Sequence, residues 1–268
     1  MVVFYYLKKY NTYMKINKFR WCNYEWEDCM EGGRKIHSNA PYTWYSSDEN
    51  VLSRRRNGEL HFYYRENPKE VTYWDGNIYK PSIERALIRT TTPFDYGTFS
   101  IEAMMPTGLN VSCAFWLSGD GNWPPEIDIL EAWAESNNYS HQLSNCFPWL
   151  CPSWRTTWNV HYNNNKMKHD HFGSKNIFKH DQPLDPTTNW IKYECEWLPD
   201  KITFKANGKT TKTVGKKYSQ MLVNNLNKPE KGHLMDVILD INVDDPKLIP
   251  NRLDTPFKVR NFMYEPMD

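Results

Sequence analysis

From residue 59 onward, apolar and polar residues alternate in one run of the sequence after another. The run "WIKYECEWL" (190–198) alternates strictly from Ile191 to Trp197, and "SIERALIRT" (82–90) does so nearly. Because successive side chains of a strand point to opposite faces, a period of two is typical of strands that bury one face. The other runs of this kind are 59–65, 96–105, 234–243 and 257–265. The alternation therefore predicts an all-β chain.

Two local signals refine this prediction. Asn207 and Gly208 lie between two alternating runs, and this dipeptide tolerates the positive φ angles of a type I′ hairpin turn. Helical spacing occurs only at 216–227, which predicts one short helix. Segment 137–185 is rich in Asn, Pro, His and Lys, and long irregular segments of this kind are functional loops or disordered.

Length and charge limit the kinds of protein that this chain can be. At 268 residues it is most economically one large domain, with residues 1–40 as an irregular lead-in and 41–268 as the folded domain. The 33 Lys and Arg residues nearly balance the 32 Asp and Glu residues, so the charge does not argue for a nucleic acid or a membrane surface as partner. The chain has 12 Trp residues, more than packing needs, which favours binding of a ligand by some of these rings.

The N-terminus and the cysteines leave the compartment open. The apolar run in "MVVFYYLKK" is too short for a signal peptide or a membrane span. None of the six cysteines has the paired short spacing of a zinc site. Cys22 with Cys29, and Cys146 with Cys151, would close small loops in an oxidising compartment, and free thiols in a reducing one would give the same sequence.

Three like charges stand out in "WPPEIDILEAW" (123–133). Glu126, Asp128 and Glu131 lie among apolar residues, with no Lys or Arg to offset their repulsion. On a regular strand Glu126 and Asp128 share one face, and Glu131 falls on the other. One extra residue in a β-bulge near Ile129 or Leu130 returns Glu131 to the face of the other two. A shared site for the three acids therefore requires a bulge.

Such an arrangement suits a retaining glycosidase, whose two carboxyl groups lie about 5 to 5.5 Å apart. One of them attacks the sugar as the ionised form, and the other donates a proton. Like charges held close together in a low-dielectric cleft separate the pKa values of the two carboxyl groups in this way. The alternatives are a solvent-facing strand and a calcium site. Like charges on neighbouring positions destabilise a sheet, and loops supply calcium ligands more readily than one strand does.

The motif Glu126-Ile-Asp128-Ile-Leu-Glu131 resembles the Glu-x-Asp-x-x-Glu signature of glycoside hydrolase family 16 in its bulged form. Further likeness lies in 96–119, 189–209 and 234–243, and together the resemblance covers roughly residues 57–264. It implies a β-jelly-roll sandwich of two antiparallel sheets, with a cleft on the concave face. It also implies that Glu126 is the nucleophile, Asp128 its supporting residue and Glu131 the acid/base.

Further residues are candidates for the same site. His161 is expected on a strand beside the catalytic one, near the acid/base, where it would tune that proton or bind sugar hydroxyls; a histidine with a purely structural role is the alternative, and His141 is a weaker rival. Aromatic rings are natural platforms for a pyranose. The candidates are Trp116, Trp123 and Trp133, of which Trp116 lies in an apolar run and is also a candidate for the core.

The choice of substrate rests on basic runs and on departures from the family. Arg54, Arg55, Arg56 and the run 166–180 are suited to sulfate or carboxylate groups, although such runs are more often solvated. The ending "LDINVDD" (239–245) lacks the glycine often seen in the glucanases. These features favour a β-galactan of the agar, porphyran or carrageenan type, with β-1,3- or mixed β-1,3/1,4-glucan as the alternative.

The expected protein is a retaining endo-glycosidase that needs no cofactor and no catalytic metal, with a structural calcium ion as an option. Its expected partner is a polysaccharide, not a nucleic acid or a membrane. It is expected to be a monomer that acts outside the cell or at its surface. A carbohydrate-binding jelly roll without activity is the rival, although a lectin has no need of two Glu residues flanking an Asp.

Overall fold

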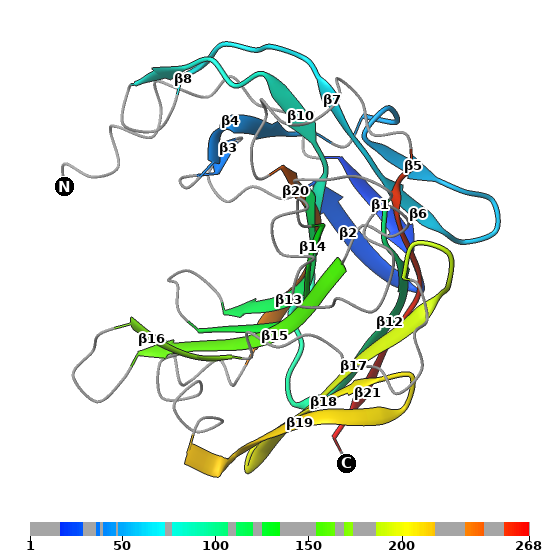
Figure 1. Ribbon diagram of the computed structural model, residues 1–268, viewed down its shortest axis with the longest axis vertical. Helices are drawn as coiled ribbons and strands as arrows, with labels where there is room; N and C mark the ends of the chain where they lie inside the picture. Colours follow the sequence, from blue (N-terminus) through cyan, green and yellow to red (C-terminus); the bar gives the residue numbers. More distant parts are fainter. Residues whose placement is uncertain are drawn as a thin grey trace, which may run out of the picture.

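The computed structural model describes most of the chain as β-strands (Figure 1). The described residues are 17–28, 36–37, 40–46, 48–72, 77–106, 111–119, 125–134, 154–163, 169–173, 186–217, 234–243 and 255–267. Among them, no helix has the length and apolar character needed to cross a bilayer. Most of the helix predicted at 216–227 lies outside the described residues.

Eight antiparallel strands form the larger sheet. Their spatial order is β1 (Lys18–Trp21), β2 (Tyr24–Asp28), β11 (Leu87–Thr90), β20 (Met235–Val243), β13 (Val111–Gly119), β14 (Glu126–Ala134), β15 (Trp154–Asn163) and β16 (His169–Gly173). The three acids therefore lie on an inner strand of this sheet, and their neighbours on both sides are fixed by backbone hydrogen bonds.

Seven antiparallel strands form the second sheet. Their order is β19 (Lys209–Gly215), β18 (Lys201–Ala206), β17 (Ile191–Leu198), β12 (Gly97–Met104), β21 (Phe257–Pro266), β6 (Leu60–Phe62) and β5 (Leu52–Arg54). The turn between β18 and β19 has positive φ angles at Asn207 (47°) and Gly208 (77°), which confirms the predicted hairpin.

Two smaller sheets extend the sandwich. Four strands form the order β3 (Ile36–His37), β4 (Ala40–Tyr45), β10 (Ile83–Arg85) and β7 (Tyr64–Glu66), in which β4 and β10 run parallel. A two-stranded sheet pairs β8 (Val71–Thr72) with β9 (Ile78–Tyr79). Figure 1 shows that the small sheets continue the curve of the larger ones, so that the ribbon has a C-shaped outline open on one side.

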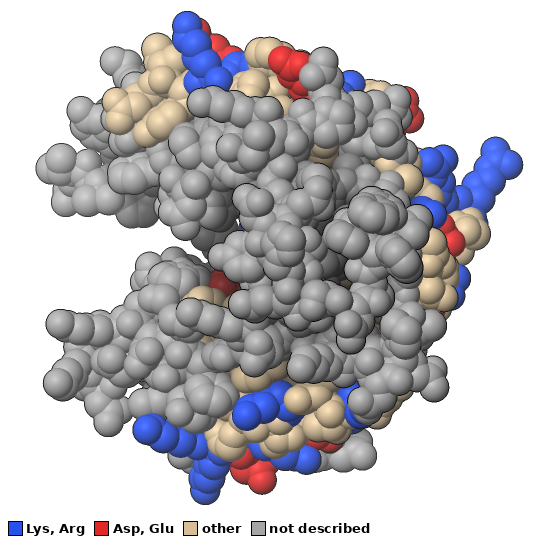
Figure 2. Space-filling model, viewed as in Figure 1, with Lys and Arg blue, Asp and Glu red and all other residues tan. Residues whose placement is uncertain are grey.

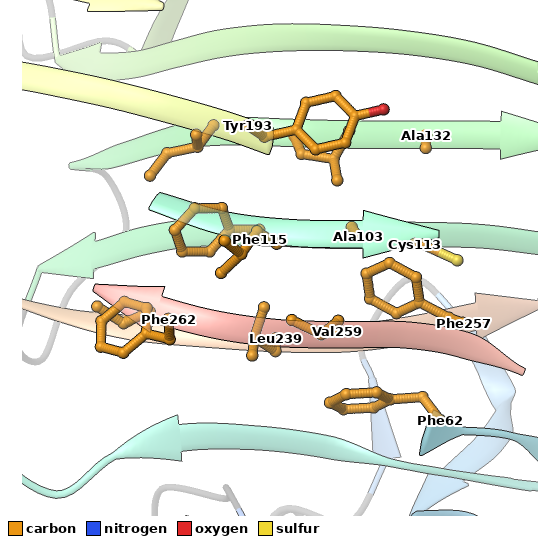
Figure 3. Packing of buried hydrophobic residues seen from close by; sticks show 14 of the residues in the cluster. Phe62, Ala103, Cys113, Phe115, Ala132, Tyr193, Leu239, Phe257, Val259 and Phe262 are labelled. Carbon is orange, nitrogen blue, oxygen red and sulfur yellow. The ribbon is translucent and has the colours of Figure 1, made fainter. Parts of the chain in front are cut away.

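The two large sheets pack face to face over one hydrophobic core (Figure 3). Phe115 and Leu239 of the eight-stranded sheet meet Val259 and Phe262 of the seven-stranded sheet, and all four side chains are almost fully buried. At the other end of the sandwich, the rings of Trp158 (β15) and Phe204 (β18) stack with their centroids 4.9 Å apart. The predicted jelly-roll sandwich of two antiparallel sheets is confirmed.

The expectation of an irregular lead-in is wrong for residues 17–28. These residues form β1 and β2, which pair with each other and join the eight-stranded sheet through β11. Cys22 and Asn23 form the turn between the two strands. Both have positive φ angles, as the two residues of an Asn-Gly turn do, although neither is a glycine. The alternation of Phe19 and Trp21 with charged residues was present in the sequence, in a run too short to stand out.

Three of the six cysteines lie in the described part of the chain. Cys22, Cys113 and Cys195 carry free thiols, so Cys22 forms no disulfide with Cys29. Cys113 and Cys195 are fully buried in the core. The proposed pair Cys146 and Cys151 lies outside the described residues.

We expect Gly97→Ala to lower the free energy of unfolding by about 1 to 3 kcal/mol, the usual cost of overpacking. A Cβ atom at Gly97 would overlap the carbonyl oxygen of Glu265 and lie 2.6 Å from Cε2 of Tyr264. Gly215→Ala is the matched control, because nothing lies within 4 Å of its Cβ position. Thermal unfolding measures both variants, and equal melting temperatures would contradict this account of the contact between β12 and β21.

Candidate active site

A β-bulge brings the three acids onto one face of β14. On β15, Glu126 pairs with His161, Asp128 with Asn159 and Glu131 with Thr157. Between Asp128 and Glu131, two residues of β14 (Ile129 and Leu130) therefore lie opposite one residue of β15 (Trp158). The pairing of β14 with β13 shifts at the same place. The bulge predicted from the sequence is confirmed, and with it the common face of the acids.

Burial shows the same division of β14. Ile127 and Leu130 are fully buried in the core, and Ile129 is almost so. The acids point the other way, away from the seven-stranded sheet, and the side chain of Glu126 keeps 15% exposure. In Figure 2, acidic atoms are visible at the inner end of the hollow on the left of the view. The Lys and Arg side chains visible in that view lie on the outer side of the molecule.

Asp128 has the most perturbed carboxyl group of the site. Its side chain is 6% exposed, and burial raises its pKa well above its usual range. The charge of Glu131, and to a smaller extent that of Asp240, raises this pKa further, while a hydrogen bond with Glu126 acts in the opposite direction. Two carboxyl groups that share a hydrogen bond need one proton between them. The raised pKa of Asp128 favours the location of this proton on Asp128.

His161 lies at the Glu126 end of the triplet. Its Nε2 atom is 3.1 Å from Oδ2 of Asp128 and 3.6 Å from Oε1 of Glu126. Oδ2 of Asp128 is nevertheless buried without a hydrogen-bond partner, so the imidazole contacts it without completing a hydrogen bond. The sequence correctly predicted a strand beside the catalytic one, but it expected His161 near Glu131.

The amide of Asn159 occupies the position beside Glu131. Its side-chain nitrogen donates a hydrogen bond to Oε2 of Glu131. The sequence interpretation did not include Asn159 among the site residues. The signal was available, because Asn159 and His161 are two apart in "TTWNVHY" and so share a strand face.

Trp116 is the one predicted tryptophan whose side chain is described. It pairs with Asp128 across β13 and β14, and it is partly buried. Its Nε1 donates to Oδ1 of Asp240 on β20, at 3.2 Å. Trp123 and the side chain of Trp133 lie outside the described parts of the structure.

The arginine run lies far from the acids. Arg54 ends β5, and its guanidinium lies 5.1 Å from the ring centroid of Phe19 on β1. β1 is five strand positions from β14, which at 4.8 Å per strand is roughly 24 Å. Arg55 donates to His61 and Tyr63, and Arg56 is exposed in the adjoining turn. The structure does not bring Arg54, Arg55 and Arg56 to the acids.

Part of the second basic run lies on β16, and β15 separates it from the strand that carries the acids. Its residues His169–Gly173 form β16, which pairs with β15 so that His171 lies across from His161. The rest of the run, like His141, lies outside the described residues.

Glu126, Asp128 and His161 could also hold a metal ion, since one ligand atom from each lies within 4.8 Å of the others. Two carboxylate oxygens and an imidazole nitrogen suit a transition metal better than calcium, which takes six to eight oxygen ligands.

Comparison with known proteins agrees with this geometry. The model of glycosyl hydrolases family 16 matches residues 39–238, which include all three acids, His161 and Asn159. Endo-1,3-1,4-beta-glycanase ExsH of Rhizobium meliloti is 46% identical over 44 residues. That match spans 16% of this chain and 10% of ExsH.

Solved structures share the fold at low identity. LamA_E269S from Z. galactanivorans, in complex with laminaritriose and laminaritetraose, is 15% identical with a TM-score of 0.62. The likeness covers 94% of this chain and 96% of that one. Beta-agarase A from Zobellia galactanivorans is 12% identical with a TM-score of 0.55, covering 89% and 81% of the two chains. At these identities the likeness concerns the fold.

We expect Asp128→Asn to be more stable than the wild type at neutral pH. The unfolded chain releases this proton near pH 4, whereas the native carboxyl keeps it to higher pH, so the native state loses stability as pH rises through that interval. An amide has no such proton to lose, and it still donates to Glu126. At pH 7 the melting temperature should rise by at least about 2 °C, as expected for roughly 1 kcal/mol in a protein of this size.

Thermal unfolding from pH 3.5 to 8 measures the effect, which should vanish at the acid end. Asp48→Asn is the control of opposite sign, because hydrogen bonds from the backbone and side chain of Asn50 lower the pKa of Asp48. That variant should gain no stability as pH rises. A gain for Asp128→Asn that is the same at every pH would contradict the protonated Asp128.

Proposed function

Because the chain belongs to glycoside hydrolase family 16, we propose that it hydrolyses internal β-linkages of a polysaccharide with net retention of configuration. The observation that carries this proposal is the bulge in β14, which puts Glu126, Asp128 and Glu131 on one face of the sheet. The endo mode of action rests on the similarity to ExsH, an endo-acting glycanase by name.

In the first step, Glu126 attacks the anomeric carbon while Glu131 protonates the leaving oxygen. The carbon–oxygen bond of the linkage breaks as a covalent bond to Glu126 forms. Asp128 supports this step through its hydrogen bond to Glu126, which fixes the orientation of the attacking carboxylate. The imidazole of His161 lies at the same end and is suited to bind a sugar hydroxyl.

In the second step, Glu131 removes a proton from water, the resulting hydroxide attacks the anomeric carbon, and Glu126 leaves. Glu131 must therefore be protonated in one step and ionised in the other. Asn159 is suited to both states, because an amide offers an N–H donor to a carboxylate and a carbonyl acceptor to a carboxylic acid. We assign Asn159 the role of positioning Glu131.

A neutral β-1,3- or mixed β-1,3/1,4-glucan is our preferred substrate. On the described face around the acids, Arg89 is engaged by Glu27 and Asp236, and Arg85 by Asp240. These three carboxylates and the three acids of β14 outnumber the two arginines. The excess of negative charge disfavours a sulfated chain at the point of cleavage.

A β-galactan is the second candidate. The sequence favoured it partly through Arg54, Arg55 and Arg56, whose distance from the acids removes that support. The pairing of His169–Gly173 with the strand beside the acids favours it, as does the shared fold of a beta-agarase. A non-catalytic carbohydrate-binding function would explain a partly exposed ring at Trp116. It would not explain why Glu126 and Glu131 lie on one face, on either side of a bulge in β14.

The proposed reaction needs no cofactor and no metal, because the carboxyl groups supply both the nucleophile and the proton. A structural calcium ion elsewhere in the chain is compatible with it. Because polysaccharides of this kind lie outside cells, we propose that the protein acts outside the cell or at its surface, and that it does so as a monomer.

We expect Glu126→Gln to lower kcat by at least about 10³-fold, because the amide cannot form the covalent intermediate. Binding of the oligosaccharide product should persist. Glu131→Ala should lose activity too, and azide should restore part of it with an aryl glycoside whose leaving group needs no proton. Rates with and without azide measure both effects. Activity of Glu126→Gln near that of the wild type would show that the nucleophile is misassigned.

Substrate choice is tested by incubating the protein with β-glucans, agarose and sulfated galactans and identifying the products. We expect cleavage of a neutral β-glucan at a rate that hardly changes with salt, because no ion pair with the substrate is involved. A sulfated substrate held by exposed basic residues would be cleaved more slowly as salt rises, since the screening length is about 8 Å at physiological ionic strength. Cleavage of a sulfated galactan with such a salt dependence would reverse our preference.

A further inference from the structure

A buried arginine lies beside the face that carries the acids. Arg85 ends β10, and its side chain is 1% exposed. Its guanidinium donates to Oδ2 of Asp240 at 2.9 Å, to the carbonyl of Ile241 at 2.6 Å, to the hydroxyl of Tyr45 at 2.6 Å and to Oγ1 of Thr43 at 3.1 Å. It also lies 4.3 Å from the ring centroid of Tyr45. These contacts fix Arg85 and join the four-stranded sheet to β20.

Asp240 uses its two oxygens in two directions. Oδ2 accepts from Arg85 and Oδ1 accepts from Nε1 of Trp116. The side chain of Asp240 is 13% exposed, and the buried guanidinium neutralises its charge. Asp240 therefore connects the fixed guanidinium of Arg85 to the indole of Trp116 through two hydrogen bonds.

The ring of Trp116 is held on its apolar side as well. Tyr45, Leu87 and Ile238 form a small buried cluster on this face, and Trp116 packs against it. The cluster is separate from the main core between the two large sheets. Since Trp116 pairs with Asp128 across the sheet, the ring stands directly beside the catalytic acids.

We propose that Asp240, held by Arg85, is a positioning residue that sets the orientation of the Trp116 indole and thereby the seating of the sugar ring next to Glu126 and Glu131. The inference rests on the proposed function, in which Trp116 contacts the sugar. Stacking against a ring depends on the plane of the indole, and the hydrogen bond from Nε1 fixes rotation of that plane. Neither Arg85 nor Asp240 needs to touch the substrate.

An alternative is that the ion pair only stabilises the fold. Removing one charge would leave the other buried and unpaired, which destabilises a protein whatever the role of the pair. The test therefore removes both charges. Arg85→Met/Asp240→Asn keeps an oxygen that accepts from Nε1 of Trp116, and Arg85→Met/Asp240→Leu has nearly the same shape at position 240 but no acceptor.

The experiment compares these two variants with Trp116 present and again with Trp116→Phe, which keeps a ring but has no N–H. With Trp116 present, we expect the change from Asn to Leu at position 240 to raise KM for the best oligosaccharide of the substrate panel about tenfold. With Trp116→Phe, the same change should alter KM less than twofold. Melting temperatures of all four proteins are measured in parallel.

An equal effect on KM in both backgrounds, or a change in melting temperature alone, would overturn the proposal. If the proteins that carry Arg85→Met do not fold, the comparison of Asp240→Asn with Asp240→Leu is made with Arg85 retained. Calorimetric binding of the same oligosaccharides to the Glu126→Gln forms of these proteins gives a second readout that requires no turnover. Absence of cleavage by the wild type would reject the proposed function, whereas the binding comparison would still decide the role of Asp240.

Discussion

The site depends on one extra residue in β14. In a strand without the bulge, Glu131 would face the core. Its carboxylate would then lose its hydration and take the place of an apolar side chain, which is unfavourable. The bulge lets Ile127, Ile129 and Leu130 face the core while all three carboxyl groups face outward. The hydrophobic effect and the catalytic geometry therefore demand the same distortion of the backbone, and the paired strands on both sides hold it in place.

Like charges on one face are tolerated because their surroundings differ. Asp128 is buried, and its raised pKa favours the protonated form, which would not repel Glu126. Arg85 compensates the charge of Asp240. The polar groups of this face thus form connected pairs, and the hydrophobic core behind β14 supplies the rigidity that keeps them in register.

The sequence predicted what is local or periodic. The acids, the bulge, the Asn207-Gly208 turn and the two-sheet fold follow from the alternation of residues and from a compact motif. Arg85 and Asp240 are 155 residues apart in the chain, and only the pairing of strands brings them together. Asn159 was on the predicted face, but its partner depends on how the bulge shifts the register with β15. The β1 and β2 strands were missed because Cys22 and Asn23 form a turn that lacks the usual glycine.

The most direct test of the account is to trap the covalent intermediate. The protein is incubated with a 2-deoxy-2-fluoro glycoside that carries a good leaving group, and the intact mass and the labelled peptide are determined by mass spectrometry. The account predicts one fluoroglycosyl group per chain, attached to Glu126 and slowly released on addition of an acceptor. A label on Glu131, or turnover to a product of inverted configuration without any label, would contradict it.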